Sequence, residues 1–468
     1  MRPVVTPEEM AAIDAGAPEP VDELVRRAGA AVARAALDLL GGAYGRRVVV
    51  VVGKGNNGAD GRDAAVRLRR RGVRVVVLDA AAAEGTRLPA SDLVVDAAYG
   101  TGFRGSYVAP DPGGAPVLAV DIPSGVDGLT GEATDTAVRA MATVTFAARK
   151  PGLLLLPGRA HAGRVDVVDI GLDTGRARTH LVDATDVAAW FPTRPDDAHK
   201  WRSAVWVVGG SPGMTGAPVL AAAAAARAGA GYVRLSAPGV GPPLPGAPVE
   251  VVGTDLAAEG WAGAVLDEAD RFRALVVGPG LGSAAGAAAE VRRLVARSAV
   301  PVVVDGDGLR ALAGAAPASA AAAAVVLTPH DGEFEALAGH APGADRLAAT
   351  RALAAATGAV VLLKGPTTVV ADAAGAVLVV VAGDARLATA GTGDVLTGTI
   401  AALLARGLDP LRAAAAGALL HGRAALLGPA DGLVAGDIVG HLPGAISDLV
   451  SGPRASSHGS DTSTGFSR

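Results

Sequence analysis

Residues 47–61 read RVVVVVGKGNNGADG. The valine run at residues 48–52 is typical of a buried strand, and the glycines after it allow a tight turn into a helix. Similar Val/Leu runs recur along the chain and alternate with segments of helical period, which predicts a parallel α/β architecture. Ligands of such sheets bind beyond the carboxyl ends of the strands, so we expect the polar residues that follow each run to carry the function.

The alternation divides the chain into two parts. Thr6 can cap an opening helix together with Glu9, and a polar, proline-containing stretch interrupts the pattern at residues 174–199. We expect an N-terminal domain over residues 1–190, a C-terminal domain over residues 191–450, and a disordered Ser/Gly-rich tail over residues 451–468. The strands are predicted within residues 46–53, 73–80, 92–100, 116–125, 142–148 and 163–171, then 203–210, 231–238, 273–280, 301–308, 324–330, 359–365 and a pair within 367–383.

Composition excludes several classes of function. The 468 residues suffice for two domains, and a net charge of −4 without a basic run argues against nucleic acid as a partner. The absence of cysteine excludes disulfides and a Cys nucleophile, and eight scattered histidines make a zinc site improbable. The N-terminus does not look like a signal peptide, and Arg227 interrupts an Ala-rich stretch that could otherwise suggest a membrane span. We therefore expect a soluble, cytoplasmic protein.

Oxygen-bearing side chains follow three predicted strands of the N-terminal part, and a hard cation prefers such oxygen ligands. With so little negative charge among these residues, potassium is a better candidate than calcium. The alternative interpretation is that some of them only cap a helix or end a strand. The residues concerned are Asn56, Asn57, Asp60, Asp96, Asp121 and Ser124.

A dehydrogenase remains the alternative for this part. Gly53, Gly55 and Gly58 have the G-x-G-x-x-G spacing, and Asp79 lies about twenty residues beyond the loop, where an acid that binds ribose is expected. Against this interpretation, Asn56 and Asn57 place bulky polar groups in a turn that is usually compact. No catalytic His or Tyr-Lys pair follows.

The C-terminal part contains a glycine turn before a long Ala-rich helix, at residues 391–394 (GTGD). Its backbone N–H groups and the helix dipole can form an anion hole, and Asp394 at its mouth can act as a base in phosphoryl transfer. The alternative is a plain helix cap by Thr392 or Asp394. LLKGPTTVV at residues 362–370 suits nucleotide phosphates, whereas His330 taken alone is more often a structural residue. No Walker A motif occurs.

These motifs resemble those of a known family. GKGNNGADG (53–61), VVDAAYGTGFRG (94–105) and VDIPSGVDGLTG (120–131) resemble, in that order, the epimerase domain of the bifunctional NAD(P)H-hydrate repair enzymes. The motifs that look like the ADP-dependent dehydratase domain of that family are GGSPGMTGA (209–217), GPGLG (278–282), LTPHDGEFEAL (327–337), LLKGPTTVV (362–370) and GTGDVLTG (391–398). The resemblance implies a Rossmann-like three-layer α/β/α domain followed by a ribokinase-like α/β domain.

The resemblance also implies an activity and its residues. The first domain would interconvert the R and S hydrates of NADH and NADPH, and the second would dehydrate the S form while consuming ADP, with Mg²⁺. We expect a homo-oligomer that binds neither nucleic acid nor membrane. Epimerase substrate contacts would come from Asn56, Asn57, Gly58, Ala59, Asp60, Gly100, Thr101, Gly102, Phe103, Arg104, Gly105 and Asp121, and potassium ligands from Asn57, Asp96 and Ser124. Dehydratase substrate contacts would come from Ala217, Gly280, Gly282, His330 and Asp394, and ADP contacts from Lys364, Gly365, Pro366, Thr367, Thr368, Gly391, Thr392 and Gly393.

Asp121 and Asp394 are the expected catalytic residues. The hydrate is a hemiaminal, so it can lose and regain its hydroxyl through an iminium while Asp121 moves the proton. Dehydration needs a better leaving group than hydroxide, which phosphorylation assisted by Asp394 would supply.

Other interpretations remain open at this point. A ribokinase-like small-molecule kinase fused to a Rossmann-type cofactor-binding domain is the main alternative, and a non-enzymatic cofactor-binding regulator is a third. Five positions depart from the usual family pattern: Ala59, Trp201, Gly306, the pair Asp384-Ala385, and Ala390. A methyl group at Ala59 or Ala390 is tolerable if the backbone there has a negative φ.

Overall fold

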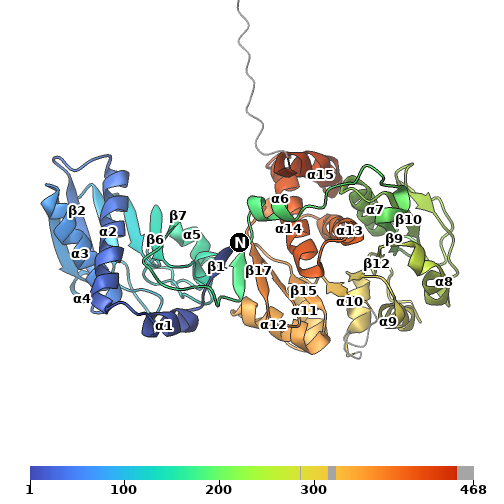
Figure 1. Cartoon of the computed structure of the whole chain (residues 1–468), viewed down its shortest axis with the longest axis horizontal. Helices are drawn as coiled ribbons and strands as arrows, with labels where there is room; N and C mark the ends of the chain where they lie inside the picture. Colours follow the sequence, from blue (N-terminus) through green and yellow to red (C-terminus); the bar gives the residue numbers. More distant parts are fainter. Residues whose placement is uncertain (285, 315–322, 451–468) are drawn as a thin grey trace, which may run out of the picture. The chain divides into compact units, whose positions relative to one another are not determined.

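The computed structural model describes residues 1–284, 286–314 and 323–450 (Figure 1). The predicted disorder of residues 451–468 falls outside these residues. The described chain forms two β-sheets with helices between the strands, which confirms the predicted α/β class.

The first sheet is wholly parallel and has the strand order β3-β2-β4-β5-β6-β7. All of its strands fall inside the predicted segments. Their bounds are β2 (Arg47–Val52), β3 (Arg74–Asp79), β4 (Leu93–Ala97), β5 (Val117–Val120), β6 (Ala142–Phe146) and β7 (Arg164–Val168). The helices of this part are α1 (Pro7–Ala15), α2 (Val21–Leu40), α3 (Asn56–Arg70), α4 (Ala80–Ala83) and α5 (Gly158–Ala162).

The valine run of β2 is continuous because both faces of this strand are buried. Val48, Val50 and Val52 belong to the core that includes residues of α2 and α3. Val49 and Val51 belong to a second core, on the opposite face, with residues of α4. A strand covered on both sides cannot show the alternation of polar and apolar residues that marks a half-exposed strand.

The predicted cap of the first helix is also observed. Thr6 Oγ1 accepts a hydrogen bond from Glu9 N at 3.1 Å, and Glu9 Oε2 accepts one from Thr6 N at 2.8 Å. Two backbone donors at the start of α1 are satisfied in this way.

The second sheet has the strand order β1-β8-β17-β16-β15-β14-β13-β12-β9-β10-β11. Eight of these strands were predicted: β9 (Ala204–Val208), β10 (Tyr232–Ser236), β12 (Ala274–Val277), β13 (Val302–Val304), β14 (Val325–Leu327), β15 (Val360–Leu363), β16 (Thr368–Ala371) and β17 (Val377–Val380). Three were not: β1 (Arg2–Val4), β8 (Thr179–Leu181) and β11 (Val252–Gly253). None of these three is a run of Val and Leu like the equally short β13 and β14, and pairing with neighbours defines them.

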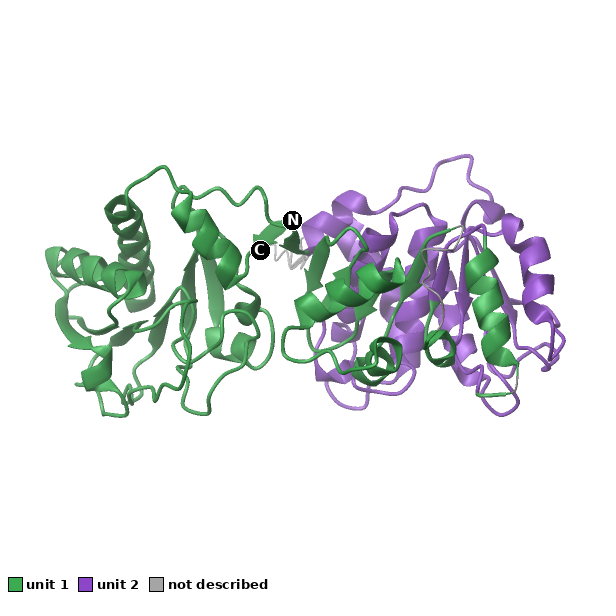
Figure 2. Ribbon diagram, turned by 90° about the horizontal axis from the view of Figure 1, so that it is seen from below, with its two compact units in different colours: residues 1–182, 283–298, 304–381 green, residues 183–282, 299–303, 382–468 purple. Residues whose placement is uncertain are grey.

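The described residues divide into two compact units (Figure 2). Unit 1 comprises the described residues within 1–182, 283–298 and 304–381, and unit 2 comprises those within 183–282, 299–303 and 382–450. Within unit 1, β1 pairs antiparallel with β8, and β8 pairs parallel with β17. Residues 179–181 therefore belong to the second sheet although the predicted pattern lapses there. The domain division at residue 190 stays a prediction.

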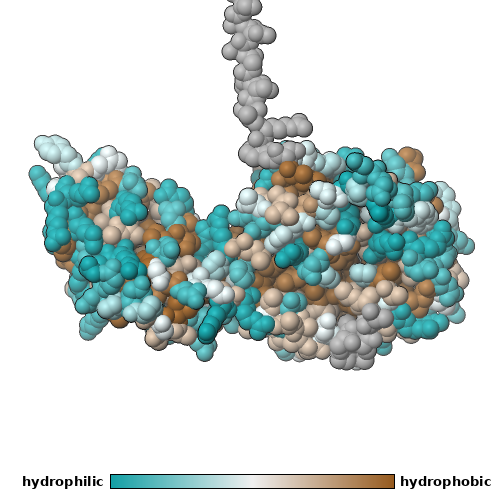
Figure 3. Space-filling model, in the orientation of Figure 1, coloured by the Kyte–Doolittle hydropathy of each residue, from teal (hydrophilic) through white to brown (hydrophobic). Residues whose placement is uncertain are grey.

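The remaining helices follow the strands of the second sheet. They are α6 (Ala184–Trp190), α7 (Gly216–Arg227), α8 (Trp261–Glu268), α9 (Ala287–Arg297), α10 (Asp307–Leu312), α11 (Asp331–Ala338), α12 (Arg346–Thr357), α13 (Thr392–Ala405), α14 (Pro410–Leu426) and α15 (Ala435–Val450). Within residues 1–284, 286–314 and 323–450, no helix combines the length and apolar character needed to cross a bilayer. Hydrophilic residues are spread over the face drawn in Figure 3.

Small residues allow α13 and α7 to pack closely in unit 2. A Cβ atom built on Gly398 of α13 would lie 2.0 Å from the backbone oxygen of Ala221 in α7. No real Cβ atom approaches a backbone oxygen so closely. Glycine at position 398 is therefore a packing requirement.

We predict that Gly398→Ala destabilises the protein by about 1–3 kcal/mol, because the helices must move apart to admit one methyl group. Gly440→Ala in α15 is the matched control, since a Cβ there meets nothing within 4 Å. That change should be neutral or stabilise by up to about 1 kcal/mol through helix propensity. Urea unfolding of both variants measures the difference, and equal stabilities would contradict the packing argument.

Candidate active sites

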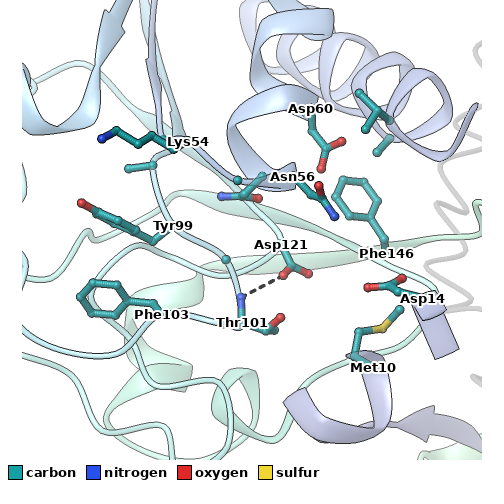
Figure 4. Close-up of a pocket in the computed structure, with 18 of the residues that line it drawn as sticks. Met10, Asp14, Lys54, Asn56, Asp60, Tyr99, Thr101, Phe103, Asp121 and Phe146 are labelled. Carbon is teal, nitrogen blue, oxygen red and sulfur yellow. Dashed lines mark hydrogen bonds between the residues drawn. The ribbon is translucent and has the colours of Figure 1, made fainter. Parts of the chain in front are cut away.

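The carboxyl ends of the first sheet border a cavity of about 770 Å³, which we call the N-terminal pocket (Figure 4). The parallel register places Val52 at the end of β2 beside Ala97 at the end of β4. The loops that follow these strands therefore meet at one edge. The predicted residues that line the pocket are Asn56, Asn57, Asp60, Gly100, Thr101, Gly102, Phe103 and Asp121.

Four predicted contacts do not line this pocket: Gly58, Ala59, Arg104 and Gly105. Gly58 has a structural role instead, because a Cβ on it would lie 2.0 Å from the backbone oxygen of Gly53. Arg104 is exposed, and its Nη1 donates a hydrogen bond to the backbone oxygen of Phe103 at 2.7 Å. Their roles in substrate binding stay predictions.

Asp121 is held on both carboxylate oxygens. Its Oδ1 accepts hydrogen bonds from Lys150 Nζ at 2.6 Å and from Thr145 Oγ1 at 3.1 Å. Its Oδ2 accepts one from Thr101 N at 3.2 Å, which is the dashed line in Figure 4. Burial alone would raise the pKa of Asp121, but the Lys150 ammonium and these hydrogen bonds outweigh it and lower the pKa. Asp121 also has a φ of 67°, an uncommon conformation for a non-glycine residue.

Lys150 is a pocket residue that the sequence analysis missed. Its side chain is 1% exposed, and its Nζ also donates to Thr145 Oγ1 at 2.9 Å and to Phe146 O at 3.1 Å. The signal was available, because Lys150 follows shortly after the predicted strand that became β6. Asp14 of α1 was missed as well, since nothing in the sequence links a helix so early in the chain with this pocket.

Asp60 differs from Asp121 in its surroundings. It is 7% exposed and lines the pocket, and no hydrogen bond or ion pair of its side chain is found among the described residues. Burial, followed by the negative charges of Asp121, Asp63 and Asp14, raises the pKa of Asp60 from 3.8 to about 8. Asp60 does not cap α3, whose cap residue is Gly55, so the alternative interpretation is wrong for this residue.

The residues proposed to bind potassium form two groups. Ser124 Oγ donates to Asp96 Oδ1 at 2.7 Å, and Ser124 N donates to Asp96 Oδ2 at 2.8 Å. Burial raises the pKa of Asp96 to about 6 despite these hydrogen bonds. Asn57 is different, because both side-chain polar atoms are buried without a hydrogen-bond partner. An unpartnered amide oxygen beside the pocket fits a cation that prefers oxygen ligands.

In unit 1, Lys364 lies at the end of β15 between two carboxylates. Its Nζ is 2.8 Å from Asp305 Oδ1 and 3.6 Å from Glu333 Oε2. Asp305 Oδ1 also accepts a hydrogen bond from Thr328 Oγ1 at 2.9 Å. The sequence analysis predicted Lys364 but neither carboxylate, because they come from segments about thirty to sixty residues away.

His330 caps helix α11. Its Nδ1 accepts hydrogen bonds from Gly332 N at 3.0 Å and Glu333 N at 3.3 Å, and Glu333 Oε2 accepts one from His330 N at 2.9 Å. This is a structural role of the kind that was the alternative interpretation for this residue. A contact of His330 with substrate stays a prediction.

Arg346 adds a cation beside the predicted ADP turn. Its guanidinium pairs with both oxygens of Asp331, at 3.0 and 2.7 Å, and donates to Lys364 O at 2.9 Å. A Cβ on Gly365 would lie 3.0 Å from Arg346 Nη2. Thr367 is buried, and its hydroxyl donates to Leu154 O at 2.6 Å, so this hydroxyl already has a partner within unit 1.

Unit 2 brings together its own set of predicted residues. Gly391 precedes the first residue of α13 with a φ of +88°, and a Cβ on it would lie 4.0 Å from Asp394 Oδ2. The hydroxyl of Thr392 donates to Leu387 O at 2.8 Å, so it does not cap the helix. A Cβ on Gly280 would lie 3.5 Å from Ala217 Cβ. Gly280 thus lies beside the first turn of α7, and Gly391 lies beside Leu220 of the same helix.

Most of the departures from the family pattern have simple local explanations. Asp121 and Ala147 are the non-glycine residues with positive φ in the described chain, so Ala59 and Ala390 meet the stated condition. Asp384 accepts a hydrogen bond from Arg386 N at 3.0 Å and caps a short 3₁₀ turn. Trp201 packs against Tyr232, with ring centres 4.4 Å apart.

The fold and these strand-end residues define an α/β protein with candidate sites in its N-terminal and C-terminal parts. A family model described as NAD(P)H-hydrate dehydratase matches residues 205–442, and one described as YjeF-related protein N-terminus matches residues 21–87 and 78–152. The chain belongs to the family of bifunctional NAD(P)H-hydrate repair enzymes. The motif resemblance is thereby confirmed, and the dehydrogenase, kinase and regulator alternatives are set aside.

Relatives of this family are similar over most of their length. The bifunctional NAD(P)H-hydrate repair enzyme of Salinibacter ruber is 39% identical, and the match covers 90% of this chain and 91% of that protein. The enzyme of the same name from Mycobacterium tuberculosis is 43% identical, covering 80% of this chain and 82% of that protein.

Two solved structures resemble the C-terminal part. The ADP/ATP-dependent NAD(P)H-hydrate dehydratase of Bacillus subtilis, co-crystallised with ATP and Mg²⁺, has a TM-score of 0.50 and 29% identity, covering 57% of this chain and 97% of that chain. A ribokinase-like superfamily protein of Enterococcus faecalis has a TM-score of 0.50 and 22% identity, covering 58% of this chain and 96% of that chain. The expected ribokinase-like fold is confirmed.

The raised pKa of Asp60 predicts how stability depends on pH. In the folded protein Asp60 keeps its proton up to a pH of about 8, whereas in the unfolded chain it loses the proton near its ordinary pKa of 3.8. The folded state therefore loses stability relative to the unfolded chain as the pH rises from about 4 to about 8. This loss in the free energy of unfolding is at most about 1.4 kcal/mol per pH unit, and Asp60→Asn removes it. The variant should therefore melt higher than wild type at pH 7, and the difference should shrink toward pH 4. Asp135→Asn, at an exposed position, is the control, and equal melting curves for Asp60→Asn and wild type at pH 7 would contradict the prediction.

Proposed function

We propose that the chain interconverts the R and S hydrates of NADH and NADPH in its N-terminal part, and that its C-terminal part dehydrates the S form while converting ADP to AMP and phosphate. The observation that carries this proposal is that one chain contains both family regions, each with its polar residues at strand ends or helix starts. The name of the Bacillus subtilis relative and its crystals with ATP and Mg²⁺ support nucleotide use in the second step.

In the N-terminal pocket, residues 56–60 and 100–105 would hold the hydrated cofactor. The reacting carbon carries a hydroxyl and is bonded to the ring nitrogen, so loss of the hydroxyl gives an iminium that water can attack from either face. Asp121 would act as the base, because its lowered pKa keeps it ionised at neutral pH. Potassium bound by Asn57, Asp96 and Ser124 would supply positive charge near the phosphates. The unpartnered amide oxygen of Asn57 supports this assignment.

In the C-terminal part, Asp394 would accept the proton of the substrate hydroxyl as that hydroxyl receives a phosphoryl group from ADP. The amides of residues 391–393, at the start of α13, would stabilise the transferred group. Lys364 through its ammonium, together with residues 365–368, would contact ADP, and Mg²⁺ would accompany the nucleotide. Ala217, Gly280, Gly282 and His330 would contact the hydrate. Phosphate is then a better leaving group than hydroxide.

The same proposal includes a cytoplasmic homo-oligomer. NADH and NADPH arise in the cytoplasm, where their hydrates would form. Gel filtration with light scattering would measure the oligomeric state, and a mass equal to one chain of 45.8 kDa would contradict this part.

The function is tested with an R/S mixture of hydrated NADH, followed by the near-ultraviolet absorbance of restored NADH. Protein with ADP should restore all of the cofactor. Restoration that stops at the S fraction would contradict the epimerase, and no restoration would contradict the dehydratase. Parallel reactions with ATP, or with no nucleotide, define the phosphoryl donor.

We predict that Asp394→Asn lowers ADP-dependent dehydration by at least about 100-fold, because the general base is lost while the shape of the side chain is kept. Epimerisation by the same variant should be unchanged, since Asp121 and its pocket lie in unit 1. The two activities of one preparation are measured separately, using pure S hydrate for the first and pure R hydrate for the second. Full dehydration by Asp394→Asn would overturn the assignment.

A further inference from the structure

Epimerisation of a hemiaminal needs two proton transfers of opposite kind. One group must protonate the departing hydroxyl, because hydroxide is a poor leaving group, and another must take a proton from the water that adds to the other face. Asp121 alone does not meet both needs. Its oxygens accept hydrogen bonds from Lys150, Thr145 and Thr101, so it is held as a carboxylate.

Asp60 is a second carboxyl group with the opposite environment. Both residues line the N-terminal pocket, and Figure 4 shows them entering it from different elements, Asp60 from α3 and Asp121 from the loop after β5. Asp60 is nine-tenths buried, yet among the described residues no donor is hydrogen-bonded to its side chain. A buried carboxyl without a donor to stabilise its charge stays protonated, and its hydrogen is available to a ligand.

We propose that Asp60 is a second catalytic residue of the epimerase, the acid that protonates the departing hydroxyl, while Asp121 is the base for the incoming water and Lys150 is the positioning residue that holds Asp121. This inference rests on the proposed epimerase function. Two carboxyl groups in opposite protonation states then share the work of general acid and general base, which is a common arrangement in enzymes.

The carbon–oxygen bond breaks with both electrons going to oxygen, which takes the proton of Asp60 and leaves as water. The lone pair of the ring nitrogen forms the carbon–nitrogen double bond of the iminium. Water then adds to the opposite face, its oxygen forms the new bond, and its proton goes to the Asp121 carboxylate. Exchange with solvent returns one proton to Asp60 and removes one from Asp121, and the reverse reaction uses the two residues in exchanged roles.

The charges around Asp60 agree with this assignment. The carboxylates that face it are Asp14 from α1, Asp63 from its own helix and Asp121, and their charges add to burial in raising its pKa to about 8. The buried cation of the pocket, Lys150, stabilises the Asp121 carboxylate, and its Nζ lies 2.6 Å from Asp121 Oδ1. At neutral pH, Asp60 is therefore protonated while Asp121 is ionised.

We predict that Asp60→Asn lowers the enzyme-catalysed rate of R-to-S conversion by at least about 100-fold, because an amide cannot donate an acidic proton. The uncatalysed rate is subtracted from both measurements. Dehydration of pure S hydrate by the same variant should be unchanged, and this activity reports that the chain is folded. Asp135→Asn, at an exposed position outside the pocket lining, is the matched control and should keep wild-type epimerisation.

The outcomes separate the epimerase function of the chain from the catalytic role of Asp60. No epimerisation by wild type would contradict the proposed function itself. Wild-type epimerisation by Asp60→Asn, with wild type active, would overturn only the role of Asp60. If Asp60→Asn loses both activities, the wild-type pH profile decides, because kcat/KM for epimerisation must fall on the alkaline side as Asp60 loses its proton. A profile that stays flat from pH 7 to about 9 would overturn the inference.

Lys150 is tested through the acid side of the same profile. Lys150→Met removes the cation beside Asp121, so the pKa of Asp121 should rise and the acid limb of kcat/KM should move to higher pH. Lys150→Arg keeps a cation, so its acid limb should lie closer to that of wild type than the limb of Lys150→Met does. A purely structural role would lower the rate without moving the limb, and an unmoved limb in Lys150→Met would overturn the positioning role.

Discussion

The parallel pairing of β2 with β4 and of β4 with β5 is the constraint on which the N-terminal site depends. Parallel strands all end at one edge of the sheet, so residues that follow Val52, Ala97 and Val120 meet although dozens of residues separate them in the chain. Both faces of the sheet are covered by apolar cores, which fixes the direction of each strand end. The site is a consequence of this geometry and of the polar residues placed there.

Electrostatics in the pocket follow from burial of charge with few counter-charges. A buried ammonium, Lys150, lies 2.6 Å from one carboxylate, Asp121, whereas Asp60 has no such partner among the described residues. Burial raises the pKa values of Asp60 and Asp14, because the protein interior solvates charge poorly. This arrangement costs stability at neutral pH, as strained or desolvated active sites commonly do, and in return it provides a carboxyl group that is protonated at neutral pH.

Close backbone approach explains much of the unusual composition. Gly58 must be glycine because the turn after β2 folds back onto Gly53, and Gly398 must be glycine because α13 lies against α7. Ala59 and Ala390 have no positive φ, so a methyl group is tolerated at both positions.

The sequence by itself determined the α/β class, nearly all longer strands, the family and the two pocket loops at residues 56–60 and 100–103, because each of these depends on short-range patterns or on motifs of contiguous residues. Only the tertiary structure decided that β1 and β8 join the second sheet, that Lys150 holds Asp121, and that Asp305 and Glu333 flank Lys364. These features depend on contacts between distant segments, and no local pattern records such contacts. The protonation states of Asp60 and Asp121 were equally invisible, since identical side chains differ only in the surroundings that folding gives them.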